Sequence, residues 1–173
     1  MKYFIYFIIS FIIFLPKITH SKLELAEEKF LEKMNANGNI QKNRLIVKKD
    51  QLGKIQIPMG HKYKKRIFTY WTSDQQTIWI LNSIGKYKPI TAAFVVEECK
   101  IKSANVLIYR EQHGYEIKYK AFLSQFTNVD INDKYDLNKK IDNISGATLS
   151  VNSMDRMARA ALILNNLAND NKC

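Results

Sequence analysis

Apolar and polar residues alternate, or form short apolar runs, over the middle of the chain, and this pattern predicts β-strands. Residues 66–84 hold two aromatic and β-branched runs around the turn sequence SDQQ, which is typical of a β-hairpin. A second pair of strands is predicted from ITAAFVV (90–96) and IKSANVLIYRE (101–111), which flank EECK. Two weaker apolar patterns, NRLIVKK (43–49) and KIQIPM (54–59), predict further short strands.

Apolar residues recur at helical spacing in three other places. Residues 23–36 predict an N-terminal helix, residues 119–126 a short helix, and residues 151–169 a long amphipathic helix that Ser153 can cap. Between the last two, residues 127–143 are rich in Asn and Asp and predict a loop. Because the strands are consecutive, this order predicts an α+β domain in which a small antiparallel sheet is flanked by helices.

The N-terminus combines Lys2, an apolar run over residues 3–16 and the small residues of KITHSK, which is typical of a secretory signal. The run is shorter than the roughly 20 residues that cross a bilayer, so we expect cleavage after Ser21. An uncleaved anchor formed by the same run is the alternative. No cysteine follows the run, which excludes a lipoprotein signal. Both hypotheses place the rest of the chain outside the cytoplasm, in the periplasm or at the cell surface.

The same patterns suggest how the chain is divided. We expect a signal or anchor over residues 1–21, an N-terminal helix and irregular segment over 22–65, and the main domain over 66–173. The 173 residues are 46% hydrophobic, which suffices for a packed core, and carry a formal net charge of +11. The lysines are scattered and form no recognisable nucleic-acid module, so we expect no nucleic-acid partner. The charge suits an acidic partner or an anionic membrane surface.

Cysteine and histidine are scarce. Cys99 and Cys173 allow one disulfide, which the sequence does not establish, and Cys173 is expected to be an exposed thiol in the tail. Together with three widely spread histidines they show no metal-ligand spacing, so no metal site is predicted.

The stretch DNISGATLS (142–150) places small and hydroxyl-bearing residues just before the last predicted helix. A helix N-terminus offers free backbone amides and a positive dipole end, which suit a phosphate. Gly146 allows a close backbone approach, Ser145, Thr148 and Ser150 add hydroxyls, and Asp142 can orient a hydroxyl or hold a metal ion. A capped helix start after a glycine turn is the structural alternative, and Asn-Ile-Ser is also a glycosylation pattern.

At this stretch the sequence resembles the FMN-binding domains, whose flavinylation motif reads Asp, two residues, Ser, Gly, Ala, Thr. These domains occur in the FMN-carrying subunits of Rnf and sodium-translocating quinone reductase complexes and in many exported flavoproteins. The resemblance implies that the hydroxyl of Thr148 is joined to the phosphate of FMN. It also implies a partner, the exported FAD:protein FMN transferase, which uses Mg²⁺ to form this bond.

A second block supports the resemblance. IYREQHGYEI (108–117), followed by FLSQF (122–126), is similar to the Arg-Glu, Gly, Glu-Ile and Phe-Gln-Phe signature that precedes the motif in the family. The similarity covers roughly residues 66–167, with EECK as a departure from the usual turn, and it leaves 22–65 without a counterpart. The cofactor-binding residues that it implies are Thr148, Asp142, Ser145, Gly146, Ala147, Glu111, Gly114 and Glu116.

Other side chains of the second block have open roles. Tyr109, His113 and Tyr115 can stack on the flavin ring or edge it, and packing within a hairpin is the alternative. Glu111 and Glu116 can hydrogen-bond the ring or the ribityl chain, and Arg110 can pair with Glu111 or contact the cofactor.

The resemblance implies an exported flavoprotein that acts as an electron-transfer carrier rather than a stand-alone enzyme, with a membrane-associated donor or acceptor as its partner. The chain is too short for a separate substrate domain and lacks ligands for an iron–sulfur cluster or haem. The alternatives are a flavin-dependent reductase subunit and, if Thr148 is unmodified, a non-flavin scaffold or interaction protein.

Overall fold

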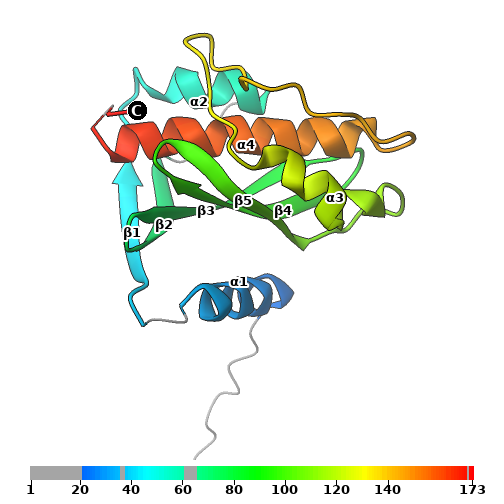
Figure 1. Ribbon diagram of the computed structural model, residues 1–173, viewed down its shortest axis with the longest axis horizontal. Helices are drawn as coiled ribbons and strands as arrows, with labels where there is room; N and C mark the ends of the chain where they lie inside the picture. Colours follow the sequence, from blue (N-terminus) through cyan, green and yellow to red (C-terminus); the bar gives the residue numbers. More distant parts are fainter. Residues whose placement is uncertain (1–20, 36–37, 61–65, 171) are drawn as a thin grey trace, which may run out of the picture.

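The computed structural model describes residues 21–35, 38–60, 66–170 and 172–173. The predicted signal or anchor therefore lies outside the described residues, except for Ser21. The centre of the fold is a five-stranded antiparallel sheet in the order β1-β2-β3-β4-β5 (Figure 1). Its strands are β1 (Gln41–Ile46), β2 (Ile67–Ser73), β3 (Gln76–Ile84), β4 (Pro89–Glu97) and β5 (Lys100–Ile108). The predicted α+β class is confirmed, as are both hairpins.

Helices cover both faces of this sheet. α4 (Thr148–Ala168) and α2 (Leu52–Met59) lie on one face, and α1 (Lys22–Met34) lies on the other and contacts β5 (Figure 1). The short α3 (Lys120–Leu123) follows β5, between the 3₁₀ turns η1 (Tyr115–Lys118) and η2 (Ser124–Phe126). The short helix predicted for 119–126 and the loop predicted for 127–143 are thus confirmed in outline.

The sequence of β4 is apolar at nearly every position, with Thr91 as a buried polar exception, because the strand is buried on both faces. Ile90, Ala92 and Phe94 belong to the core between the sheet and α4, while Ala93 and Val95 are fully buried on the opposite face. A strand that is buried on both faces needs apolar residues at every position rather than at alternate ones. β4 is therefore, together with β3, the part of the sheet on which α4 packs.

α2 corrects one prediction. KIQIPM (54–59) is helical rather than extended, and its helix ends at Gly60, which has a φ of 68°. Leu52, Ile55 and Met59 recur at helical spacing, and their side chains are buried in the core that α2 shares with α4. Packing against α4 thus outweighs the alternation of Ile and Gln and the presence of Pro58 in the last turn.

The N-terminal helix is confirmed as α1, which begins with a capping box. Ser21 Oγ accepts a hydrogen bond from the amide of Glu24, and a Glu24 side-chain oxygen accepts one from the amide of Ser21. Its predicted apolar side, which includes Phe30 and Leu31, is half-buried. Within the part of the chain that the structure describes, no helix is both long enough and apolar enough to span a membrane.

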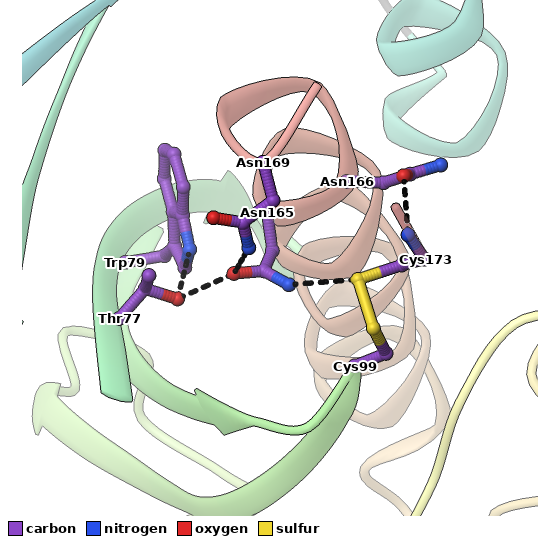
Figure 2. Close-up of a disulfide and its surroundings, with 7 residues drawn as sticks. All are labelled: Thr77, Trp79, Cys99, Asn165, Asn166, Asn169 and Cys173. Carbon is purple, nitrogen blue, oxygen red and sulfur yellow. Dashed lines mark hydrogen bonds between the residues drawn. A yellow bond between two sulfur atoms is a disulfide. The ribbon is translucent and has the colours of Figure 1, made fainter. Parts of the chain in front are cut away.

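The expectation that Cys173 is a free tail thiol is wrong. Cys173 forms a disulfide with Cys99 in the β4–β5 turn, across a sequence separation of 74 residues (Figure 2). Asn165 of α4 lies beside this bond, donates to Cys173 Sγ at 3.5 Å, and accepts from the hydroxyl of Thr77 at 2.7 Å. The Thr77 hydroxyl in turn accepts from the indole of buried Trp79 at 3.0 Å. The C-terminal end of α4 is therefore fixed both covalently and by buried hydrogen bonds.

Candidate functional site

Three segments meet at the opposite, N-terminal end of α4. They are the β3–β4 turn, the loop that follows β5, and the motif stretch at the start of α4. Together they surround a cavity of about 420 Å³, which is within the size range of small-molecule sites. The cavity is lined by Lys86, Tyr87, Lys88, Glu111, Gln112, His113, Gly146, Ala147, Thr148, Leu149 and Ser150.

α4 begins earlier than the sequence predicts. Its first residue is Thr148, its N-cap is Ala147, and no side chain caps it. Ser153, the predicted cap, lies inside the helix, where its buried hydroxyl has no hydrogen-bond partner among the described residues. The amides of Ser150 and Val151 bond to the carbonyl of Ala147, and no hydrogen bond joins the amides of Thr148 or Leu149 to a described residue. Free amides at the start of a 21-residue helix form a site for an anion.

The chain reaches Thr148 through a tight turn. The amide of Ala147 bonds to the carbonyl of Ile144 at 2.9 Å, and Gly146 has a φ of 76°, which a side chain would disfavour. Thr148 itself is exposed, and its Oγ1 accepts a hydrogen bond from Asn143 Nδ2 at 2.8 Å. The hydroxyl therefore lies at the cavity wall, beside the free helix amides, where a reagent can reach it.

Glu111 holds the β3–β4 turn. Its Oε1 accepts hydrogen bonds from the amides of Tyr87 at 2.6 Å and Lys88 at 2.9 Å. Burial acts to raise the pKa of Glu111, but the hydrogen bonds from the amides of Lys88, Tyr87 and Lys86 together outweigh it, so the pKa is lowered. A role of Glu111 toward the flavin stays a prediction. In the structure this carboxylate fixes one wall of the cavity.

Gly114 brings the second sequence block against the motif. It has a φ of 82°, and a Cβ added there would meet the Ala147 Cβ at 2.6 Å and the Tyr109 hydroxyl at 2.9 Å. Only glycine combines this backbone conformation with such a close approach. The two blocks, which are about thirty residues apart in the sequence, are thus in direct contact at this point.

Tyr109 joins the same two segments. Its hydroxyl donates to the carbonyl of His113 and lies 3.1 Å from Ser150 Oγ. Burial raises the pKa of this phenol, against the opposing effect of the hydrogen bond with Ser150. Its ring packs edge-to-face on Tyr115, with centroids 6.0 Å apart. Tyr109 and Tyr115 therefore pack against each other, between the loop after β5 and η1, and are not among the residues that line the cavity, whereas His113 lines it.

Several predicted residues lie outside the cavity lining. Asp142, Ser145 and Glu116 are exposed and are not among the residues that line it, and the amide of Asp142 donates to Gln125 Oε1 at 2.7 Å. The Arg110 guanidinium bonds to β4, to the carbonyl of Pro89 at 2.9 Å and to Thr91 Oγ1 at 3.1 Å. The structure therefore brings Glu111, Gly114, Gly146, Ala147 and Thr148 together and leaves these others at the periphery.

The sequence reasoning missed the contribution of the β3–β4 turn. Lys86, Tyr87 and Lys88 line the cavity, and Tyr87 is 76% exposed. Leu149 also lines it and is 47% exposed. The sequence signal that could have indicated this turn is GKYKP (85–89), in which two lysines flank an aromatic residue that a turn does not require for its backbone geometry. Exposed large apolar groups beside a cavity are typical of a binding surface.

The described residues suit FMN in chemistry. The free amides of Thr148 and Leu149, with Lys86 and Lys88 nearby in the lining, suit the phosphate, and Tyr87 and Leu149 offer apolar surface to the ring. No group of three or more His, Cys, Asp or Glu among the described residues could hold a metal ion.

A larger cavity of about 570 Å³ lies between the end of α2, the β3–β4 hairpin and α4. Arg156 lines it, but three hydrogen bonds tie this guanidinium to Ser83 and Ile84 of β3. Since Arg156 is already engaged in joining α4 to the sheet, the smaller cavity at Thr148 is the better candidate site.

Comparison with known proteins agrees with this choice. The model of the FMN-binding domain family matches residues 85–163, from the β3–β4 turn to the body of α4, and so includes all the residues that line the cavity. No curated protein matches the chain.

Proposed function

Because residues 85–163 belong to the FMN-binding domain family, we propose that this protein carries FMN covalently on Thr148 and acts as an exported electron carrier. The observation that supports the attachment site is the start of α4. There an exposed hydroxyl lies beside helix amides that have no other bond to a described residue, at the wall of a cavity of about 420 Å³. The bond would be a phosphoester formed by an FAD:protein FMN transferase with Mg²⁺.

Different residues of the cavity would contact different parts of the cofactor. The amides of Thr148 and Leu149 would bind the phosphate, and the lysines of the β3–β4 turn would offset its charge. Tyr87 and Leu149 would cover apolar surface of the ring, while Glu111 keeps the turn that carries Tyr87 in place. When bound, FMN would supply the redox chemistry, and the protein would orient the ring.

A carrier is the better interpretation of the site than a reductase. Among the described residues that line the cavity, His113 is the one histidine and Glu111 is the one carboxylate, and Oε1 of Glu111 is engaged with backbone amides of the β3–β4 turn rather than with His113. The net charge of +11 and the lysines at the cavity favour docking to an acidic, membrane-associated donor or acceptor. A flavin-dependent reductase subunit is the second candidate.

The disulfide supports export. Disulfides persist in oxidising compartments, and Cys99 and Cys173 are paired. Ser21 caps α1, so cleavage after Ser21 would remove this cap, whereas an uncleaved anchor would keep it. N-terminal sequencing of the protein recovered from the periplasm and from membranes distinguishes the two, and a pool confined to the cytoplasm would contradict export.

The attachment is tested by intact mass. The wild-type chain and the Thr148→Ala variant are each incubated with FAD, Mg²⁺ and the transferase. We expect the mass of one FMN to be added to the wild type and none to the variant. The two proteins should have the same melting temperature. Thr148→Ser, which keeps a hydroxyl, is the matched control. Labelling of the Thr148→Ala variant would show that the attachment residue is wrong. The loaded domain, reduced and mixed with membranes or with small acceptors, then separates carrier from reductase, since only a reductase turns over rapidly with a small molecule.

A further inference from the structure

The hydroxyl of Thr148 is held by one neighbouring side chain. Asn143 Nδ2 donates to Thr148 Oγ1 at 2.8 Å, and Asn143 Oδ1 accepts from the amide of Ile144 at 2.9 Å. The second bond fixes which way the amide group points, because the oxygen faces a backbone N–H and the NH₂ group must then face Thr148. Asn143 therefore meets Thr148 as a donor.

This contact is not a helix cap. A capping asparagine accepts, through its oxygen, a hydrogen bond from an amide of the first helical turn. Asn143 instead directs its donor to a side chain, and the amides of Thr148 and Leu149 stay without a bond to a described residue. Both side chains are exposed, so a hydrogen bond between them adds little to the stability of the fold. Fold stability therefore does not account for it.

We propose that Asn143 is a positioning residue for the attachment of FMN to Thr148, an inference that rests on the proposed function. In that step Oγ1 of Thr148 attacks the FMN phosphorus of FAD. The new Oγ1–P bond replaces the P–O bond to AMP, which leaves with its electron pair, and the hydroxyl proton passes to a base of the transferase or to water. No oxidation or reduction takes place.

The hydrogen bond from Asn143 would act on this step in two ways. It restricts Oγ1 to one rotamer, so the nucleophile is already placed when the transferase binds. It also stabilises the negative charge that develops on Oγ1 as its proton leaves. Asn143 uses one lone pair of the hydroxyl oxygen, so the other lone pair is left for the phosphorus.

Two substitutions of Asn143 distinguish an effect of its hydrogen bond to Thr148 from an effect of its bond to the loop backbone. Asn143→Ala removes both hydrogen bonds, whereas Asn143→Asp keeps the oxygen that accepts from Ile144 and loses the donor to Thr148. We measure FMN attachment by intact mass against time with the full chain, purified transferase, FAD and Mg²⁺. Both variants should lower kcat about tenfold, the effect of one hydrogen bond to a group that gains charge, with KM for the acceptor chain and the melting temperature unchanged. Asn39→Ala, which removes an exposed amide bonded to Asp74, is the matched control and should react like the wild type.

Each other outcome overturns the inference. A wild-type rate for Asn143→Asp would mean that loop shape, not donation, matters. Equal slowing by Asn39→Ala, or an effect on KM or melting temperature alone, would mean a non-specific or structural role. If the wild type and both Asn143 variants take FMN on Thr148 equally fast, the proposed function stands and this inference falls. If the wild type takes none, both fall.

Discussion

The two ends of α4 are built in opposite ways. At its C-terminal end, the Cys99–Cys173 disulfide and the buried chain from Asn165 through Thr77 to Trp79 satisfy the polar groups and close the structure (Figure 2). At its N-terminal end no side chain caps the helix, two amides have no bond to a described residue, and Thr148 is exposed beside a cavity. Stability is therefore concentrated at one end of the helix, and the polar groups of the other end are kept available for a ligand.

The largest loss of stability should come from removing the disulfide at the C-terminal end of α4, which we call the closed end; the N-terminal end, beside the cavity, is the open end. Cys99→Ser with Cys173→Ser removes a cross-link between positions 74 residues apart, and loss of its constraint on the unfolded chain costs about 4 kcal/mol of unfolding free energy. Chemical denaturation measures this loss. The folded double variant should still take FMN on Thr148, because the cavity lies at the other end of α4.

Thr148→Ala is the control for that experiment, because it should take no FMN and should keep the unfolding free energy of the wild type. A double variant that unfolds at the wild-type denaturant concentration would show that the closed end owes its order to packing and to the Asn165 network alone. A double variant that is stable but unlabelled would show that the two ends are coupled, which contradicts the division of roles described above.

A smaller effect is expected from Gly114→Ala at the open end. The new Cβ would meet the Ala147 Cβ at 2.6 Å in a backbone with a φ of 82°, at a cost on the order of 1–3 kcal/mol. We expect the loop after β5 to move away from the motif, so that FMN attachment slows and the unattached cofactor binds more weakly, as measured by fluorescence titration with FMN.

Gly146→Ala separates the cost of a side chain at a positive φ from the cost of the steric clash that Gly114→Ala also introduces. Gly146 also has a positive φ, 76°, but a Cβ there would meet no atom within 4 Å. It should therefore cost less stability than Gly114→Ala. If the two variants lose equal stability, contact between the loop after β5 and Ala147 does not matter, and the cavity wall is held by other bonds.

The same contrast explains which features the sequence could predict. At the N-terminal end of α4, the helix start and the turn before it are formed by residues that are close together in the chain, so DNISGATLS indicated them, although the absence of a side-chain cap hid the true start of α4 at Thr148. The closed end depends on Cys99 meeting Cys173, which no local pattern encodes. α2 was missed because Ile55, Gln56 and Ile57 alternate as in a strand, while burial against α4 decides the outcome. The role of Tyr87 required the β3–β4 turn to be placed beside α4.

The smallest expected effect concerns Glu111, which holds that turn. Its pKa is lowered in the folded protein because hydrogen bonds from the turn amides outweigh the effect of burial, so the unfolded chain binds the proton more readily. Its contribution to stability is thus fully present above the ordinary carboxyl pKa of 4.5 and is lost as the pH falls below that value through the lower folded pKa. Wild type and Glu111→Gln, unfolded by denaturant at several pH values, should differ at pH 7 and converge on acidification. Glu116→Gln, an exposed carboxyl nearby, controls for the loss of one negative charge. A difference that does not change with pH would mean that Glu111 supports the turn by its shape, and that the ionised carboxylate is not what holds Tyr87 at the cavity.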